Sequence, residues 1–329
     1  MEARENLLVV DRLKTQFFTY GGVVEALDEV SFEIQKGEIF GLVGESGCGK
    51  SVTATSILRL VAKPGKIISG RVLLDGQDLL EKNDHEMNSI RGSRIAMIFQ
   101  DPTSSLNPVF RIGRQVGEPY VYHQHRGKRQ ALMDATRILA KTGFPDADEK
   151  ARNYPHELSG GLRQRAMIAM ALTCEPELLI ADEPTTNLDV TIGRQILDLV
   201  KDLQREFGAS VLWITHDMAV VAQMCDRVGV MYAGNIVEKT DVRTLFRNAK
   251  HPYTVRLLRA IPSAAKSAET LEEIPGSVPQ LIHPPSGCRF HPRCDSAMDV
   301  CSQAKPLEIE VEPGHVVACH LFRGKGKVT

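Results

Sequence analysis

One segment constrains this chain more than any other: Gly44-Glu45-Ser46-Gly47-Cys48-Gly49-Lys50-Ser51. It fits G-x-x-x-x-G-K-[ST], the pattern of a phosphate-binding loop, in which backbone N–H groups surround phosphates at places where side chains would collide. An apolar run of strand type, residues 39–43, precedes it, and a helical pattern, Val52–Leu60, follows it. A strand, a glycine loop and a helix N-terminus in this order are the context that the motif needs. We therefore predict an α/β fold with a nucleotide site, in which Lys50 reaches the β- and γ-phosphates and Ser51 binds Mg²⁺.

The length and composition place the chain among soluble globular proteins. With 329 residues we expect one large domain and an appendage. The formal net charge of −1 gives no general electrostatic reason to expect nucleic acid as a partner. The sequence contains no run of about 18 apolar residues, and its first residues are polar and charged, so we expect neither a membrane span nor a signal peptide. These features predict a cytosolic, reducing location, where cysteines are free or metal-bound rather than paired in disulfides.

Strand patterns flank the loop on both sides. Val9–Phe18 and Ala26–Ile34 are predicted strands joined by a turn that contains Tyr20. The ring of Tyr20 either stacks on adenine or is an ordinary aromatic residue at a strand end, and the sequence leaves both interpretations open. Ile95–Phe99 has the character of a buried strand and ends at Gln100.

A helical region is predicted for about residues 103–174, as an insertion into the α/β core, with one helical pattern over Lys128–Thr142. Within it, Ser159 is a natural N-cap for a helix that continues over residues 163–172. Gly160 and Gly161 follow this cap. The segment forms either a second anion-binding helix N-terminus or a plain capped helix.

Two acidic residues end the next apolar strand. Leu178–Ala181 runs into Asp182 and Glu183, which is the second motif of a phosphate-loop nucleotide site. Asp182 would hold Mg²⁺ through water, and Glu183 would orient or deprotonate the water that attacks the γ-phosphate. His216 follows a further predicted strand, residues 211–215. Ligands bind at the carboxyl ends of strands in open parallel sheets, so a histidine there can hydrogen-bond a γ-phosphate.

These motifs together resemble those of ATP-binding-cassette (ABC) ATPases, over roughly residues 7–245. The elements that carry the resemblance, in chain order, are the loop 44–51, Gln100, residues 158–164, residues 178–183, Asp189 and His216. The wider chain resembles one branch, the ATP-binding subunits of bacterial dipeptide and oligopeptide importers. The segments that resemble this branch are 99–108, 154–157, 251–254 and 287–294, with Cys301 and Cys319. The chain departs from the branch at Asn187, where a small Ala is usual, which could alter contacts across a dimer.

The resemblance implies a mechanism that needs two nucleotide domains. In ABC ATPases they pair head to tail, so that Ser159, Gly160 and Gly161 would cap the ATP on the partner's loop. The sandwich closes through contacts that require the γ-phosphate and opens after hydrolysis. By resemblance, the catalytic residues are Glu183, His216 and Gln100; the Mg²⁺ ligands are Ser51, Gln100 and Asp182; and ATP is bound by Tyr20, the loop 44–51, Ser159, Gly160, Gly161 and Asp189.

The resemblance also implies partners and a location. A second, homologous ATPase, two membrane permease subunits and, indirectly, an external solute-binding protein would assemble with this chain at the cytoplasmic face of the membrane. Such a complex would import dipeptides or oligopeptides, or another small solute such as a nickel complex. A soluble ABC ATPase acting on DNA or ribosomes is a weaker alternative, because such proteins usually carry two cassettes or a long coiled coil. A phosphate-loop kinase ranks last, because it would lack the signature at residues 158–164. We expect the nucleotide-binding domain over residues 1–248 and a C-terminal extension over 249–329.

The seven cysteines are unevenly distributed. Cys48 lies beside Lys50 and a helix N-terminus, which favours a thiolate, but an inert thiol facing the protein is equally compatible with the sequence. The last stretch is expected to be small and irregular, because it has few apolar residues and many prolines. Its four cysteines predict a metal site, with the spacing C-x₅-C-x₆-C-x₁₇-C over Cys288, Cys294, Cys301 and Cys319. Spacing alone leaves zinc open, with His291 or His320 in place of a cysteine; the resemblance to peptide importers favours a [4Fe–4S] cluster.

Overall fold

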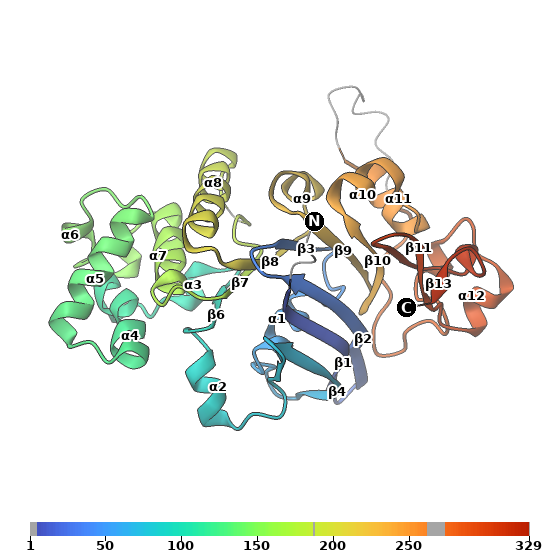
Figure 1. Ribbon diagram of the computed structural model, residues 1–329, viewed down its shortest axis with the longest axis horizontal. Coiled ribbons are helices and arrows are strands. Elements are labelled where there is room, and N and C mark those ends of the chain that lie inside the picture. Colours follow the sequence, from blue (N-terminus) through green and yellow to red (C-terminus); the bar gives the residue numbers. More distant parts are fainter. Residues whose placement is uncertain (1–4, 187, 262–273, 329) are drawn as a thin grey trace. The chain divides into compact units, whose positions relative to one another are not determined.

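The computed structural model describes residues 5–186, 188–261 and 274–328, which fall into two compact units (Figure 1). The first unit comprises residues 1–5, 35–37 and 81–213, and the second comprises residues 6–34, 38–80 and 214–329. Asn187 lies outside the described residues. The expected boundary between cassette and extension at residue 248 remains a prediction.

The first unit contains a buried parallel sheet. Strand β6 (Ile95–Ile98) pairs in parallel with β7 (Leu178–Asp182), and β8 (Ser210–Thr215) is the neighbour of β7 on its other side. Every residue of β7 and β8 is buried, as expected for continuous apolar strands covered on both faces. Because β6 and β7 are parallel, their carboxyl ends lie at the same edge of the sheet, just before Gln100 and Glu183.

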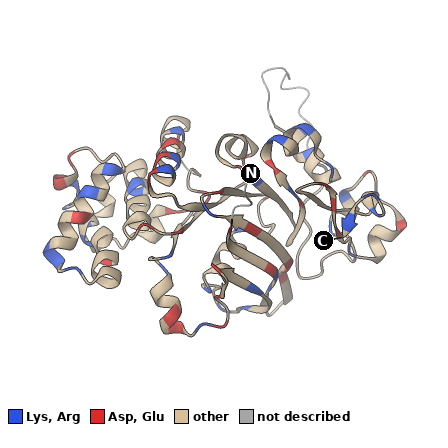
Figure 2. Ribbon diagram, in the orientation of Figure 1, with Lys and Arg blue, Asp and Glu red and all other residues tan. Residues whose placement is uncertain are grey.

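The region predicted as a helical insertion is helical and contains no strand. Its helices pack on one another, and α5 has the predicted extent to within a residue (Figure 1). Helix α8 buries Ile196, Val200 and Leu203 on one side, while basic and acidic residues alternate along it (Figure 2). The helices of this unit are α2 (Asp84–Ile90), α3 (Pro102–Ser105), α4 (Ile112–Gln124), α5 (Lys128–Lys141), α6 (Ala147–Lys150), η1 (Pro155–Glu157), α7 (Gly160–Leu172) and α8 (Val190–Phe207).

An antiparallel sheet of four strands forms one part of the second unit. The predicted hairpin is present as β1 (Asn6–Thr19) and β2 (Gly22–Gln35), with Tyr20 in the turn between them. Strand β1 pairs on its other side with β4 (Gly65–Leu74), and β5 (Gln77–Asp78) completes the order β2-β1-β4-β5.

The other part of this unit is a mixed sheet built on the strand that precedes the phosphate loop. Strand β3 (Ile39–Val43) pairs in parallel with β9 (Arg227–Tyr232), and β9 pairs antiparallel with β10 (Asn235–Asp241). The sheet then continues into the C-terminal region. Its further strands, in spatial order, are β12 (His315–Ala318), β11 (Glu308–Glu312) and β13 (Lys327–Val328).

The C-terminal region is irregular over most of residues 274–298, but its last part forms the regular strands β11, β12 and β13, contrary to the expectation from its prolines. Val316 and Val317 extend the sheet by pairing with Lys239 and Glu238 of β10, and β-branched residues of this kind favour strands. Gly314, at a φ of +73°, closes the turn between β11 and β12. The short hairpin obtains its stability from the edge that β10 offers, which the local sequence does not reveal.

Short helices complete the second unit. They are α1 (Lys50–Ile57), α9 (Met218–Met224), α10 (Val242–Asn248), α11 (Pro252–Arg259), η3 (His291–Arg293), α12 (Asp299–Gln303) and η4 (His320–Phe322). None of the helices in the described part of the chain is long and apolar enough to cross a bilayer.

Candidate functional site

The phosphate loop of the second unit has the compact form that its glycines predict. It connects β3 to α1, and Gly49 caps α1 at a φ of +110°. A Cβ on Gly44 would lie 2.1 Å from the backbone oxygen of Met231, and one on Gly49 would lie 2.8 Å from that of Ala26. Only glycine fits at these two positions, so the backbone itself forms the concave cradle in which N–H groups bind phosphate.

Lys50 lies inside this cradle. It is 5% exposed, and its Nζ donates hydrogen bonds to the carbonyl oxygens of Gly44, at 2.8 Å, and Glu45, at 3.1 Å. Ser46 and Gly47 are exposed at the rim, and Ser51 is exposed in the first turn of α1. A glycine cradle, a buried ammonium group and an exposed hydroxyl are the groups that a Mg²⁺-bound nucleotide needs, so these residues fit that ligand.

Cys48 lies inside the protein rather than at the surface of the loop. Its side chain is fully buried, and burial raises the pKa of the thiol, although Lys50 acts in the opposite direction. These observations favour the second interpretation of Cys48, a thiol that faces the protein, because loss of hydration outweighs the nearby ammonium group.

Two residues far from the phosphate loop in the sequence contact Glu45 of this loop. The hydroxyl of Tyr253 accepts a hydrogen bond from the backbone N–H of Glu45 at 3.0 Å, and Arg293 forms an ion pair with the Glu45 carboxylate at 2.9 Å. The sequence separations are 208 and 248 residues, so no local pattern could have identified these contacts.

In the first unit, the acidic residues at the end of β7 meet Gln100. The Nε2 of Gln100 donates to Oε2 of Glu183 at 3.1 Å, and the Thr186 hydroxyl donates to the same oxygen at 3.0 Å. Asp182 is only 5% exposed, and Glu183 has a φ of +46°, which is strained for a residue with a side chain. The predicted base and the predicted glutamine thus lie side by side, held in one arrangement.

The predicted signature segment lies at the start of α7. Ser159 is the N-cap, and its hydroxyl accepts from the N–H of Leu162 at 3.4 Å, as the sequence predicts. Ser159 and Gly160 are exposed. Asp189 caps the next helix, α8, by accepting from the N–H of Ile192 at 2.9 Å. Both helix N-termini are exposed; that of α7 has a neutral cap, so an anion binds favourably there, whereas that of α8 already carries the Asp189 carboxylate.

Tyr20 and His216 are both exposed residues of the second unit. Tyr20 lies with its ring wholly in solvent in the turn between β1 and β2, and His216 directly follows β8. Their predicted contacts with adenine and γ-phosphate remain predictions.

The side chains of the four cysteines of the C-terminal region are not arranged as a set of metal ligands in this structure. Among the described residues, no group of three or more His, Cys, Asp or Glu side chains is arranged to hold a metal ion. The segments that carry the cysteines nevertheless meet, since the N–H of Cys288 donates to the carbonyl oxygen of Cys301 at 2.8 Å. Burial first, and then the nearby thiols of Cys288, Cys294 and Cys301, raise the pKa of Cys319 to about 12. Burial likewise raises the pKa of the Cys288 thiol and of the Cys294 thiol.

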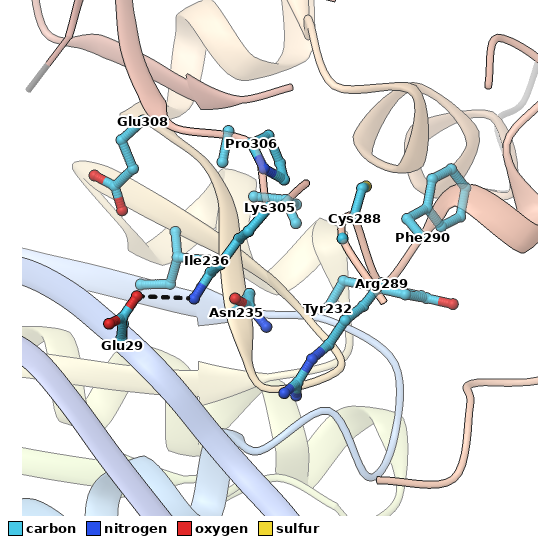
Figure 3. Close-up of a pocket in the computed structure, with 13 residues that line it drawn as sticks. Glu29, Tyr232, Asn235, Ile236, Cys288, Arg289, Phe290, Lys305, Pro306 and Glu308 are labelled. Atoms are coloured by element: carbon cyan, nitrogen blue, oxygen red, sulfur yellow. Dashed lines mark hydrogen bonds and ion pairs between the residues drawn. The ribbon is translucent and has the colours of Figure 1, made fainter. Parts of the chain in front are cut away.

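A small pocket lies between the turn after β9 and the C-terminal region (Figure 3). Its volume is about 50 Å³, and Tyr232, Asn235 and Cys288 are among its lining residues. Lys305 pairs across it with Glu29 at 3.1 Å. Pockets for small-molecule ligands usually have volumes of about 300–1,000 Å³, so this pocket is too small for a nucleotide.

Comparison with known proteins agrees with the motifs. The family model described as "ABC transporter" matches residues 27–186, and that described as "Oligopeptide/dipeptide transporter, C-terminal region" matches residues 237–301. A probable peptide ABC transporter ATP-binding protein, y4tR of Sinorhizobium fredii, is 50% identical over 95% of this chain and 94% of its own length. This chain belongs to the ATP-binding proteins of peptide ABC transporters.

Other relatives extend this result. The oligopeptide transport ATP-binding protein OppD of Escherichia coli is 47% identical, over 95% of this chain and 92% of its own. Among solved structures, the ATP-binding cassette MJ0796 is similar to this chain, with a TM-score of 0.65 and 27% sequence identity. That structure is a dimer in a post-hydrolysis state bound to ADP and Pi, and the match covers 72% of this chain and 99% of the MJ0796 chain. The predicted resemblance and the ABC ATPase fold are confirmed, and with them the assignment of the chain as a transport ATPase.

Proposed function

We propose that this chain hydrolyses ATP to drive the import of dipeptides or oligopeptides through a membrane complex. One observation carries the proposal: identity of 50% with a peptide-transporter ATP-binding protein extends over nearly the whole chain, including the C-terminal region. A match confined to the cassette would have supported ATP hydrolysis alone.

Within this function each predicted site residue has a role. The loop 44–51 binds the phosphates, Tyr20 stacks on adenine, and Ser51, Gln100 and Asp182 hold Mg²⁺. Glu183 is the general base, since its carboxylate is fixed by hydrogen bonds from Gln100 and Thr186. His216 contacts the γ-phosphate. The exposed helix N-termini at Ser159-Gly160-Gly161 and Asp189 serve ATP bound to a second cassette.

The proposed assembly contains two cassettes and two membrane permeases at the cytoplasmic face of the membrane. The dimeric MJ0796 structure supports the pairing of cassettes, and the names of the relatives support a transporter. We propose a homologous ATPase as the second cassette, and an external binding protein as the source of selectivity.

Transport by the whole complex tests the proposal. The complex, purified with its permeases and reconstituted in vesicles, is given its solute-binding protein and labelled dipeptides, longer peptides or Ni²⁺ complexes. We expect peptide uptake that depends on ATP. Uptake of nickel alone would replace peptides as the substrate, and ATP hydrolysis without any association with membrane proteins would contradict the transport function.

We propose further that Cys288, Cys294, Cys301 and Cys319 bind a metal centre, [4Fe–4S] by family resemblance. The mutual proximity of the four thiols supports this. Because the described side chains are not arranged as a ligand set, binding would require the thiols to reorient and lose their protons. Protein purified without air should contain iron and acid-labile sulfide in near-equal amounts, and Cys319→Ser should lose both. Stoichiometric zinc without sulfide would exclude the cluster, and metal-free folded protein would exclude the site.

A further inference from the structure

Glu45, the second residue of the phosphate loop, is held at three points. Its N–H donates to the hydroxyl of Tyr253 at 3.0 Å, and its carbonyl oxygen accepts from Lys50 Nζ at 3.1 Å. Its carboxylate receives both arms of the Arg293 guanidinium, with Nη1–Oε2 at 2.9 Å and Nη2–Oε1 at 3.2 Å. Two of the three partners lie outside residues 27–186, the part that matches the ABC transporter family model.

The Arg293 side chain is fixed in its orientation. It is only 7% exposed, and it also donates to the carbonyl oxygens of Pro275, at 2.8 Å, and Ile274, at 3.1 Å. Its own carbonyl oxygen accepts from Arg256 of α11 at 2.9 Å. A buried guanidinium with this many partners presents a rigid, two-pronged donor, unlike a surface arginine that can turn away.

Tyr253 is fixed equally well. Its side chain is fully buried in the first turn of α11, where its N–H donates to Nδ1 of His251 at 3.1 Å. Its ring centroid lies 4.7 Å from that of Tyr232 and 5.4 Å from that of Phe290. The aromatic cluster therefore sets the position of the hydroxyl group that meets the loop.

The charge of Glu45 makes this arrangement relevant to nucleotide binding. A carboxylate in a phosphate-binding loop repels the triphosphate, and at 27% exposure the Glu45 side chain is incompletely screened by water. The Arg293 guanidinium cancels this charge and, together with Tyr253, fixes the backbone whose N–H groups form the cradle.

We propose that Arg293 and Tyr253 are positioning residues of the ATP site, by which the C-terminal region sets the affinity of the phosphate loop for nucleotide. The inference rests on the proposed role of residues 44–51 in ATP binding. It gives the C-terminal region a function in the ATPase cycle that does not depend on whether the cysteines bind metal.

The test is a charge-rescue experiment on the full chain, with binding of a fluorescent ATP analogue measured in Mg²⁺ and thermal unfolding recorded for each variant. Arg293→Gln should raise the Kd about tenfold, since it leaves the carboxylate unpaired. Adding Glu45→Gln to this variant should return the Kd to within about threefold of the Glu45→Gln single variant, because the unpaired charge is then absent.

A matched control separates positioning from general stability. Arg289 is a second buried arginine of the C-terminal region, and it pairs with Glu25 at 2.6 Å rather than with the loop. Any effect of Arg289→Gln on the Kd should not be relieved by Glu45→Gln. Equal relief in both backgrounds, or a Kd for Arg293→Gln within twofold of the parent chain, would overturn the inference.

Two further variants cover the remaining outcomes. If Arg293→Gln does not fold, Tyr253→Phe removes only the hydroxyl; we expect it to weaken ATP binding about threefold, and an unchanged Kd would contradict the inference. Lys50→Ala tests the assignment of the loop separately. If that variant binds ATP like the parent chain, the nucleotide site itself is wrongly assigned, whatever Arg293 does.

Discussion

The phosphate loop and the four-cysteine segment are both ligand sites predicted from short sequence patterns, and they have different outcomes. The loop has the compact form that its glycines require, with Lys50 inside it. The cysteines are neighbours but do not form a metal-ligand group among the described residues. The loop binds through its main chain, whose shape follows from contiguous residues. A cluster of thiols binds through side chains that must converge from distant positions, which spacing does not determine.

The largest expected effect concerns the strand-end carboxylate, which like the loop belongs to a contiguous motif. In the assembled complex, Glu183→Gln should bind ATP but hydrolyse it about 10²–10⁴-fold more slowly, because the amide cannot accept a proton from water. Single-turnover hydrolysis measures this. Thr186→Val, which removes the other hydrogen bond to the same oxygen, is the matched control and should have a much smaller effect. Near-normal turnover of Glu183→Gln would show that this contiguous motif was misread.

The next effect concerns the stability of the fold around α11, which should depend on pH. His251 is buried, and burial lowers its pKa to about 4, although Glu238 acts in the opposite direction. The unfolded chain therefore binds more protons than the folded one between about pH 6.5 and pH 4, and stability should fall by about 3 kcal/mol as the pH decreases through this range.

His251→Asn tests this assignment, because asparagine can still cap α11 but does not titrate. Denaturant unfolding at several pH values should show a smaller loss of stability in acid for this variant. The exposed His283→Asn should retain the slope of the parent chain. An unchanged slope in His251→Asn would locate the titrating group elsewhere.

A pair of glycine variants tests whether close backbone contact defines the loop. Gly49 and Gly47 both have positive φ, at +110° and +77°, but only at Gly49 would a Cβ meet backbone within 3 Å. Gly49→Ala should therefore cost about 1–3 kcal/mol more stability than Gly47→Ala, and weaken ATP binding more. If the two variants lose equal stability in thermal unfolding and equal affinity in nucleotide titration, then the positive φ, and not the close contact with the backbone, is the reason that glycine is needed.

The smallest effect compares the thiols of the two regions directly. Cys48 should react with an alkylating agent at least about tenfold more slowly in the folded chain than in the denatured one, with or without MgATP, because it is buried and its thiol pKa is raised. If the four C-terminal cysteines bind metal, anaerobic chelation should accelerate their labelling and leave Cys48 unaffected. Protection of Cys48 that appears only with MgATP would contradict its burial.

The sequence predicts local elements well where local chemistry determines them. Ser159 caps α7 because its hydroxyl accepts from the backbone three residues ahead, and α5 follows its helical pattern. It also places Gln100 and Glu183 each at the end of an apolar strand, and the structure shows that the two side chains meet there.

Other features depend on tertiary contacts that no local pattern encodes. The carbonyl oxygen of Cys48 accepts a hydrogen bond from the N–H of Gly234 at 2.8 Å, and the strands of the C-terminal region depend on pairing with β10. The contacts of Tyr253 and Arg293 with Glu45 cross most of the chain. A motif can therefore identify a site while giving no information about the residues that hold it.

The bond between Arg293 and Glu45 has a consequence for how the protein is made. It joins residues 248 positions apart, and at about 5–20 residues per second a ribosome needs roughly 12–50 s to advance from one to the other. Throughout this interval the nascent chain carries a complete phosphate-loop sequence whose carboxylate has no partner. If Arg293 sets the affinity of the loop as proposed, a chain that ends before this residue should bind ATP about tenfold more weakly than the finished subunit.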